Sequence, residues 1–386
     1  MRAMESLAAT IRARAHEAGF ERVGFAAAGP APHAAALRTW LESGMHGTMA
    51  YMQDPDGRRA DPVRYVSWAR SVIALGLAYR SDQATTSDAD RGAISSYAWG
   101  RDYHPVVRAR LERLRASIAA LVPEARTHPF VDTSPVLEKG LAEAAGIGWR
   151  GKHSNVIARR DGSWFFLGGL LTDLELPPDA PARDHCGTCA RCIDVCPTRA
   201  IVRPYVVDAR LCIAYLTIEH RGSIDRELRP LIGNHIFGCD DCQDVCPWNR
   251  HAVRTRLPEF EAREGALNPA LLDLIGISRP EWNRKFKKTP VRRATYEGFV
   301  RNVAVALGNW RDARAVPGLC GRLADPSPLV RGHVAWALGR IATPTAIDAL
   351  RTRRAVEDDA TVCDEIDAAL GGAPTHPDTE PRSSPP

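Results

Sequence analysis

The chain has 386 residues, of which 45% are hydrophobic, and its 51 basic and 46 acidic residues leave a net charge of +5. This content suffices for two or three domains with separate cores and excludes a disordered chain. The first twenty residues lack the apolar core of a secretory signal, and no segment reaches eighteen uninterrupted apolar residues. We therefore expect a cytoplasmic protein, in which clustered cysteines indicate metal binding or catalysis rather than disulfides.

Helix-like and strand-like segments alternate in the first part of the chain, which predicts an α/β or α+β domain. The expected helices cover residues 4–18, 32–41, 104–121 and 135–145. The expected strands cover residues 71–79, 155–158 and 164–171, with one more ending at residue 131. A proline-rich segment that begins at Leu176 predicts a boundary near residue 180. The first domain is therefore predicted to span residues 1–178.

The segment Gly146-Ile-Gly-Trp-Arg-Gly151 has the letters of a dinucleotide-binding fingerprint. Such a fingerprint must follow a strand and open a helix. Here the glycines follow an expected helix and lead into an expected strand. The segment is therefore predicted to be a close-packed loop rather than a nucleotide site.

Eight of the ten cysteines form a pattern typical of iron–sulfur proteins. Seven lie in the blocks Cys186-x2-Cys189-x2-Cys192-x3-Cys196-Pro197 and Cys239-x2-Cys242-x3-Cys246-Pro247, and Cys212 lies between them. In ferredoxin-like pairs of [4Fe-4S] clusters, the cysteine before proline ligates the other cluster. The first cluster is predicted to be held by Cys186, Cys189, Cys192 and Cys246. The second is predicted to be held by Cys196, Cys212, Cys239 and Cys242.

Cys212 is assigned to the second cluster because Ile236 stands where a regular motif would have its missing cysteine. A pair of four-cysteine zinc sites is the competing interpretation, but the third cysteine of each run and the following proline favour iron and sulfur. Cys320 and Cys363 lie far away in helical sequence and are expected to be small buried apolar residues. Residues 179–250 are thus predicted to form a ferredoxin-like domain.

Beyond residue 250 the chain reads as helical and repeats itself. Residues 301–308 match residues 332–339 at an offset of 31 positions, which predicts stacked helix pairs of the HEAT type. An all-α domain is expected over residues 251–370. The proline-rich residues 371–386 are predicted to be a disordered tail.

A basic run precedes this repeat and contains no acidic residue. Its six charged members are Arg284, Lys285, Lys287, Lys288, Arg292 and Arg293. Such a run beside Trp282 and Phe286 predicts a surface that binds nucleic-acid phosphates. The alternatives are a solvated helix face or a dock for an acidic electron donor, with both aromatic residues in the core.

Several motifs resemble those of the epoxyqueuosine reductases, which are cobalamin-dependent iron–sulfur enzymes of tRNA modification. They are residues 97–104, 131–135, 146–153 and 235–249 together with both cysteine blocks, and the resemblance spans residues 5–370. The resemblance implies base-off cobalamin between the first domain and the cluster domain, in a fold related to corrinoid reductive dehalogenases. It also implies a substrate, the epoxide of epoxyqueuosine at the wobble position of the tRNAs for tyrosine, histidine, asparagine and aspartate.

The resemblance also implies roles for single residues. It places the proton donor at Asp132, although Ser134 and Pro135 could instead make this segment an ordinary helix start. As a general acid, Asp132 would have to be desolvated so that its neutral form persists near neutral pH. The candidate contacts to cobalamin or substrate are Arg59, Tyr97, Asp132, Lys152, His153, Asn155, Thr217 and Arg221. Each contact residue except Asp132 could equally be an ordinary surface or core residue.

Together these features predict a monomeric oxidoreductase that reduces epoxyqueuosine to queuosine in tRNA. Its electrons would come from a low-potential donor such as ferredoxin or flavodoxin. Two alternatives belong to other classes: a small-molecule corrinoid reductase of the reductive-dehalogenase type, and a non-catalytic two-cluster electron carrier.

Overall fold

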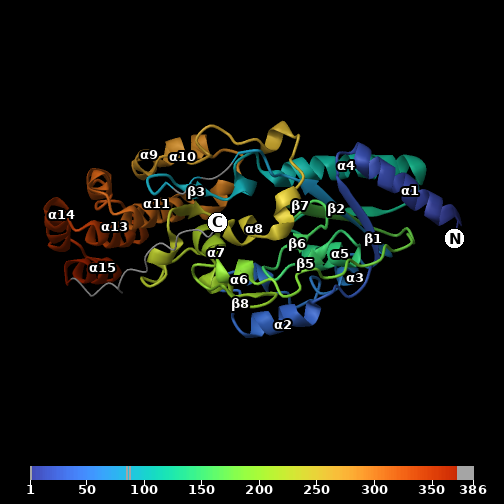
Figure 1. Ribbon diagram of the computed structural model, residues 1–386, viewed down its shortest axis with the longest axis horizontal. Coiled ribbons are helices and arrows are strands. Elements are labelled where there is room, and N and C mark those ends of the chain that lie inside the picture. Colours follow the sequence, from blue (N-terminus) through green and yellow to red (C-terminus); the bar gives the residue numbers. More distant parts are fainter. Residues whose placement is uncertain (1, 84–85, 87, 372–386) are drawn as a thin grey trace.

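The first unit of the protein is built on a four-stranded antiparallel sheet in a computed structural model that describes residues 2–83, 86 and 88–371 (Figure 1). The strands follow the spatial order β1 (Arg22–Ala27), β2 (Ser71–Ala78), β7 (Phe165–Thr172) and β4 (Thr127–Phe130). Every neighbouring pair is antiparallel. The sheet therefore makes this unit an α+β domain, one of the two expected classes. Strand β1 was not anticipated from the sequence.

Helices cover both faces of this sheet. Helices α1 (Arg2–Glu17) and α4 (Tyr103–Leu121) lie on one face, and α5 (Glu138–Ala144) lies on the other. The unit also contains α3 (Pro62–Tyr65) and α2 (Ala34–Glu42), whose Trp40 donates a hydrogen bond to the Val207 carbonyl of the cysteine region. Because successive side chains of a strand point to opposite faces, Leu75 packs in the core with Leu114 of α4, whereas Val72 packs with Leu141 of α5. Burial on both faces explains why all of β2 is buried.

The loop after α5 is closely packed, as predicted. It runs through the short strands β5 (Trp149–Arg150) and β6 (Val156–Ile157), which pair with each other. A Cβ atom on Gly148 would lie 2.3 Å from the carbonyl oxygen of Ile157, so only glycine allows this approach.

The cysteine region consists of short elements joined by loops. They are α6 (Arg191–Asp194), β8 (Ile201–Arg203), β9 (Val206–Val207), α7 (Ile213–Ile218), β10 (His235–Phe237) and α8 (Asp241–Asp244). Helix α6 packs against α8 and β8. This arrangement brings the two cysteine blocks together.

The last part of the chain is helical, as predicted, and its helices pack on one another in succession. Its helices are α9 (Leu271–Ile275), α10 (Arg279–Lys285), α11 (Tyr296–Trp310), α12 (Val316–Cys320), α13 (Pro328–Ile341), α14 (Pro344–Arg354) and α15 (Ala360–Gly371). Helices α11, α13 and α15 stack in sequence at the left of Figure 1. Cys320 and Cys363 are partly exposed on α12 and α15, rather than fully buried as expected. The predicted disordered tail lies outside the described residues, except for Gly371 at the end of α15.

A segment from the first half of the chain belongs structurally to the second half. Strand β3 (Ala93–Ile94) pairs in parallel with β10 of the cysteine region. The side chains of Ile94 and Trp99 lie in the same core as the C-terminal helices. The predicted boundaries between domains are thus crossed by this segment, which carries Tyr97 to the cysteines.

Among the described residues, no helix combines the length and apolar character that crossing a membrane requires.

Candidate active site

Two members of the first cysteine set, Cys186 and Cys189, are partly exposed, and the other two, Cys192 and Cys246, are buried. Cys186 and Cys189 lie on the loop before α6, Cys192 lies on α6, and Cys246 follows α8. Burial and the nearby charges of Cys186, Cys246 and Cys189 raise the pKa of the Cys192 thiol to about 11. Four thiols that act on one another in this way would release protons when they bind a metal. Arg183 before this set and Arg191 at the start of α6 are exposed.

The second cysteine set lines a deeper cavity of about 250 Å³. Its four members are Cys196, Cys212, Cys239 and Cys242. Burial raises the pKa of the Cys239 and Cys242 thiols far above their ordinary value. Cys212, which lies outside both blocks, therefore lies with the cysteines to which its spacing assigned it.

Three of the predicted contact residues also line this cavity, namely Tyr97, His153 and Asn155. Burial, followed by the charge of Lys139, lowers the pKa of His153 to about 4, so its imidazole is neutral at pH 7. Its Nδ1 accepts a hydrogen bond of 3.2 Å from the Asn155 amide, which leaves the hydrogen on Nε2. That Nε2 atom is buried and has no partner. It is a donor available to a ligand.

Two other predicted contact residues, Lys152 and Thr217, form hydrogen bonds within the protein. Lys152 Nζ donates to the carbonyl oxygens of Gly187 and Cys189 at 2.7 and 2.8 Å, so it braces the first cysteine loop. Thr217 is fully buried. Its hydroxyl donates to the Ile213 carbonyl at 2.7 Å and accepts from the Gly238 amide at 2.9 Å, next to the second cysteine set.

Asp132 lies in a strained turn after β4, and its side chain is 54% exposed. Its φ angle of 46° is in the left-handed region, which few residues other than glycine adopt. Its amide donates a hydrogen bond of 2.5 Å to Glu138 Oε1. Helix α5 begins only at Glu138, so the alternative of a helix start capped by Ser134 is wrong. Strain of this kind is concentrated at functional sites.

His104 at the start of α4 is the partner of Asp132, and the sequence did not reveal it. Its Nε2 lies 2.9 Å from Asp132 Oδ2, and its Nδ1 lies 2.7 Å from Asp102 Oδ1. Burial opposes a charge on His104, but the two carboxylates more than offset this and raise its pKa to about 9. The imidazole is therefore protonated at neutral pH.

The carboxyl of Asp132 is ionised in this arrangement. Burial would raise its pKa, but the hydrogen bond and charge of His104 outweigh burial, and the pKa is lowered overall. The expectation that desolvation keeps Asp132 neutral is thus not met in this state. The proton is held on His104 instead. A second acidic proton lies nearby, because burial and the charge of Asp132 raise the pKa of Glu138 to about 8.

The basic run reaches the site at Arg293, whose charge acts on Asp132, and extends away from it. All six of its charged residues are exposed, whereas Trp282 and Phe286 are core residues. Arg284, Lys287 and Lys288 line a pocket of about 510 Å³ with Arg101 and Arg263. The backbone connects the run to the site, because the Asp102 amide donates to the Lys288 carbonyl oxygen at 2.8 Å.

Arg59 and Arg221 lie at the mouth of the site rather than at the cysteines. Arg59 Nη2 donates to the Tyr51 carbonyl oxygen at 3.0 Å. Arg221 donates to the carbonyl oxygens of Ile218 and Arg293 at 2.8 and 2.7 Å. Both arginines therefore fix the backbone around Tyr51 and Arg293, a surface that we call the rim of the site.

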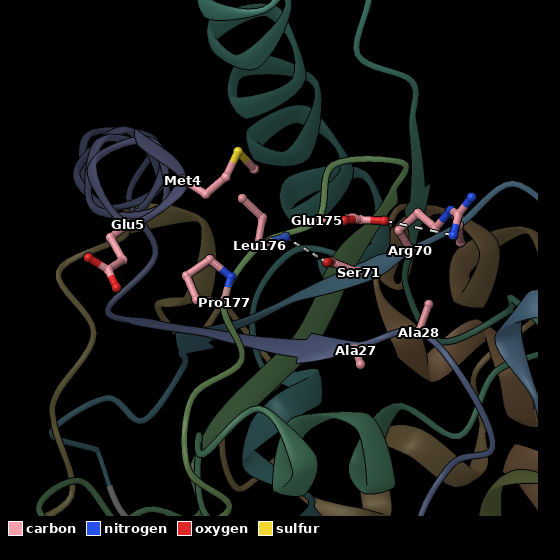
Figure 2. Close-up of a pocket in the computed structure, with 10 residues that line it drawn as sticks. Met4, Glu5, Ala27, Ala28, Arg70, Ser71, Glu175, Leu176 and Pro177 are labelled. Carbon is pink, nitrogen blue, oxygen red and sulfur yellow. Dashed lines mark hydrogen bonds and ion pairs between the residues drawn. The ribbon is translucent and has the colours of Figure 1, made fainter. Parts of the chain in front are cut away.

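A separate pocket of about 570 Å³ opens between α1 and residues 175–177, which follow β7 (Figure 2). In this pocket Arg70 pairs with Glu175 at 3.8 Å, and the Leu176 amide donates to Ser71 Oγ at 3.0 Å. None of the predicted site residues lines it.

Comparison with known families agrees with each part of this architecture. Residues 185–249 match the model of a 4Fe-4S double cluster binding domain, residues 59–133 match that of epoxyqueuosine reductase QueG, and residues 297–371 match that of HEAT repeats. The fold and the cysteine sets thus define an oxidoreductase with two [4Fe-4S] clusters and an appended helical repeat.

Individual relatives identify the family. The chain is 47% identical over 339 residues to the epoxyqueuosine reductase of Xanthomonas campestris, which covers 86% of this chain and 96% of the relative. It is 46% identical over 341 residues to that of Pseudomonas aeruginosa, with coverage of 86% and 94%. A crystal structure of an epoxyqueuosine reductase with an epoxyqueuosine-modified tRNA stem loop superimposes with a TM-score of 0.89 at 32% identity, over 95% of this chain and 99% of the other. The chain belongs to the epoxyqueuosine reductase family.

Proposed function

We propose that the protein reduces the epoxide of epoxyqueuosine to give queuosine at the wobble position of the tRNAs for tyrosine, histidine, asparagine and aspartate. The epoxide takes up two electrons and two protons, both of its C–O bonds break, a C=C bond forms and the oxygen leaves as water. The observation that carries the proposal is a cavity lined by four cysteines, together with a proton-bearing His104–Asp132 pair, in a chain of this family.

Family membership implies cobalamin as a third redox group, and the residues beside the second cysteine set fit such a ligand. A second cavity, of about 390 Å³, shares Ser154 and Val207 with the cysteine cavity. Its lining is mainly apolar and includes Leu37 and Trp40 of α2. Cobalamin bound across these two cavities would supply a strongly reducing metal centre for the epoxide. Tyr97, His153 and Asn155 would hold it on the cysteine side, with His153 Nε2 as a free donor.

The His104–Asp132 pair would supply the first proton. Asp132 is the more exposed partner and would face the substrate, while His104 stores the proton at neutral pH. As negative charge develops on the epoxide oxygen, the proton would pass from His104 Nε2 across the 2.9 Å contact to Asp132 and on to the oxygen. Asp102 would keep the imidazole ring in the orientation that this transfer needs.

Electrons would enter at the first cysteine set, because the loop between Cys186 and Cys189 is exposed. The exposed arginines next to its cysteines in the sequence are Arg183 and Arg191. They suit an acidic low-potential donor such as ferredoxin or flavodoxin. The second set would then pass electrons inward past Tyr97. We further propose that the protein works as a monomer in the cytoplasm.

The function is tested by mass analysis of nucleosides after an anaerobic reaction. The protein is reconstituted with iron, sulfide and cobalamin and given epoxyqueuosine-containing tRNA with a low-potential reductant. Loss of one oxygen from the nucleoside, only when cobalamin is present, supports the proposal. Fully loaded protein that leaves the nucleoside unchanged would instead indicate a small-molecule corrinoid reductase or an electron carrier.

The basic run would bind the phosphates of the anticodon stem. Changing Lys287 and Lys288 to glutamine should weaken tRNA binding, and the slope of log affinity against log salt should become shallower by roughly 1 to 2. Both lysines are exposed, so cluster content should not change. Filter binding at several salt concentrations measures the effect. Glutamine at Arg108 and Arg113, two exposed positions on α4, is the matched control; an unchanged slope in the lysine variant would disprove the assignment.

A further inference from the structure

The rim of the site carries an exposed aromatic ring. Tyr51 is 50% exposed and is the one aromatic among the large exposed hydrophobic residues of the described chain. It lies in a short turn, Ala50–Met52, that has no buried residue. Scattered exposed apolar residues are normal on protein surfaces. This ring differs from the others because Arg293 and Arg59 contact it or its backbone.

Tyr51 is linked to the proton-donor pair through the basic run, because Arg293 contacts its ring and the Lys288 carbonyl of the same run accepts from the Asp102 amide. Its phenol is within electrostatic reach of Asp132, Glu219 and Arg293. The guanidinium of Arg293 lies 5.5 Å from the centre of its ring. A ligand on the ring would therefore lie on the same charged surface as a substrate at Asp132.

Three arginines hold the ring and its surroundings in place. Arg293 forms a bidentate ion pair with Glu219 through contacts of 2.8 to 3.1 Å. Arg221 donates to the Arg293 carbonyl, and Arg59 donates to that of Tyr51. These contacts fix the ring from the backbone and from the Arg293 side, while half of its surface stays open. A preorganised ring loses little conformational entropy when a flat ligand stacks on it.

We propose that Tyr51 is a stacking platform for a nucleobase of the anticodon loop, the one next to the modified nucleotide. The inference rests on the proposed function. A base that reacts inside an enzyme leaves its stack, so its neighbour loses a partner. Proteins bind such loop bases on aromatic rings and arginine planes, whatever the base, since every base has a π-face. Tyr51 replaces the lost partner, and the charges of Arg59, Arg221 and Arg293 suit the flanking phosphates.

The test measures RNA binding to the holoenzyme without reductant, so that no turnover occurs. The probe is an epoxyqueuosine-containing anticodon stem-loop with 2-aminopurine next to the modified nucleotide. Its fluorescence is quenched when the base stacks. Tyr51→Ala should weaken binding by about 10-fold and abolish the quenching gained on binding, whereas Tyr51→Phe should retain both. Leu231→Ala removes an apolar side chain that is 42% exposed and serves as the matched control.

Two results would overturn the platform. One is Tyr51→Ala that binds and quenches like the wild type. The other is a Tyr51→Ala variant that loses cobalamin, seen in its visible spectrum, while its RNA affinity is unchanged. Failure of the proposed function looks different: the wild-type protein would bind and quench the probe but yield no queuosine when reductant is added.

Discussion

Changing Asp132 to asparagine should lower the rate constant of epoxide reduction by about 10²- to 10⁴-fold, the usual contribution of a positioned general acid. Asparagine keeps the size of the side chain but cannot carry the proton from His104 to the epoxide oxygen. Cluster content and tRNA affinity should stay as in the wild type, because the carboxylate takes part in neither. Single-turnover reactions with quantification of queuosine by mass analysis measure the rate constant.

The pH dependence of the same rate constant identifies the proton store. The raised pKa of His104, about 9, means that the proton is present below that pH and lost above it. The wild-type rate should therefore fall as the pH rises through about 9. His104→Gln should remove this step and react slowly throughout the neutral range. Asp348→Asn, at an exposed carboxylate on α14, is the control; Asp132→Asn within about threefold of the wild type would contradict the assignment.

Changing Cys212 to alanine should remove about half of the bound iron and sulfide, because the second cluster loses a ligand. Electrons could then enter the first cluster but not reach the cavity that Tyr97 lines, so queuosine formation should fall to background. Iron analysis, the visible spectrum and electron paramagnetic resonance of the reduced protein measure the loss. Resonance of the oxidised protein would detect a three-iron cluster if a single iron were lost.

Cys320 and Cys363 provide the matched controls for this prediction. Both are partly exposed on helices of the repeat domain, so alanine there should leave the iron content and turnover unchanged. Cys212→Ala with the full iron content would show that another group completes the second cluster. Colourless wild-type protein that contains zinc would revive the zinc interpretation.

Local sequence signals predicted much of this structure. The cysteine spacing and Ile236 pointed to Cys212, which does line the cavity with the other three cysteines. Apolar periodicity predicted α1, α4 and β7 to within a few residues. Such signals succeed because each can be read from the spacing of residues along the sequence.

The missed features depend on contacts between distant segments. The pairing of His104 with Asp132 joins the start of a helix to a turn 28 residues later, and no local pattern marks it. No local pattern marks the ionised state of Asp132 either, because its lowered pKa depends on His104. The error at Ser134 had another cause: serine and proline commonly begin a helix, but here the chain makes a strained turn first and α5 starts at Glu138.

The pairing of β3 with β10 sets the order in which the protein can fold during synthesis. Strand β10 leaves the ribosome roughly 140 residues after β3, a delay on the order of 10 s. Over that time the four-stranded sheet can form, but the segment around β3 has no partner, and Trp99 lacks the core that later buries it. Tyr97 is therefore among the last residues of the site to reach its place. The cysteine cavity closes late, on a unit that has already folded.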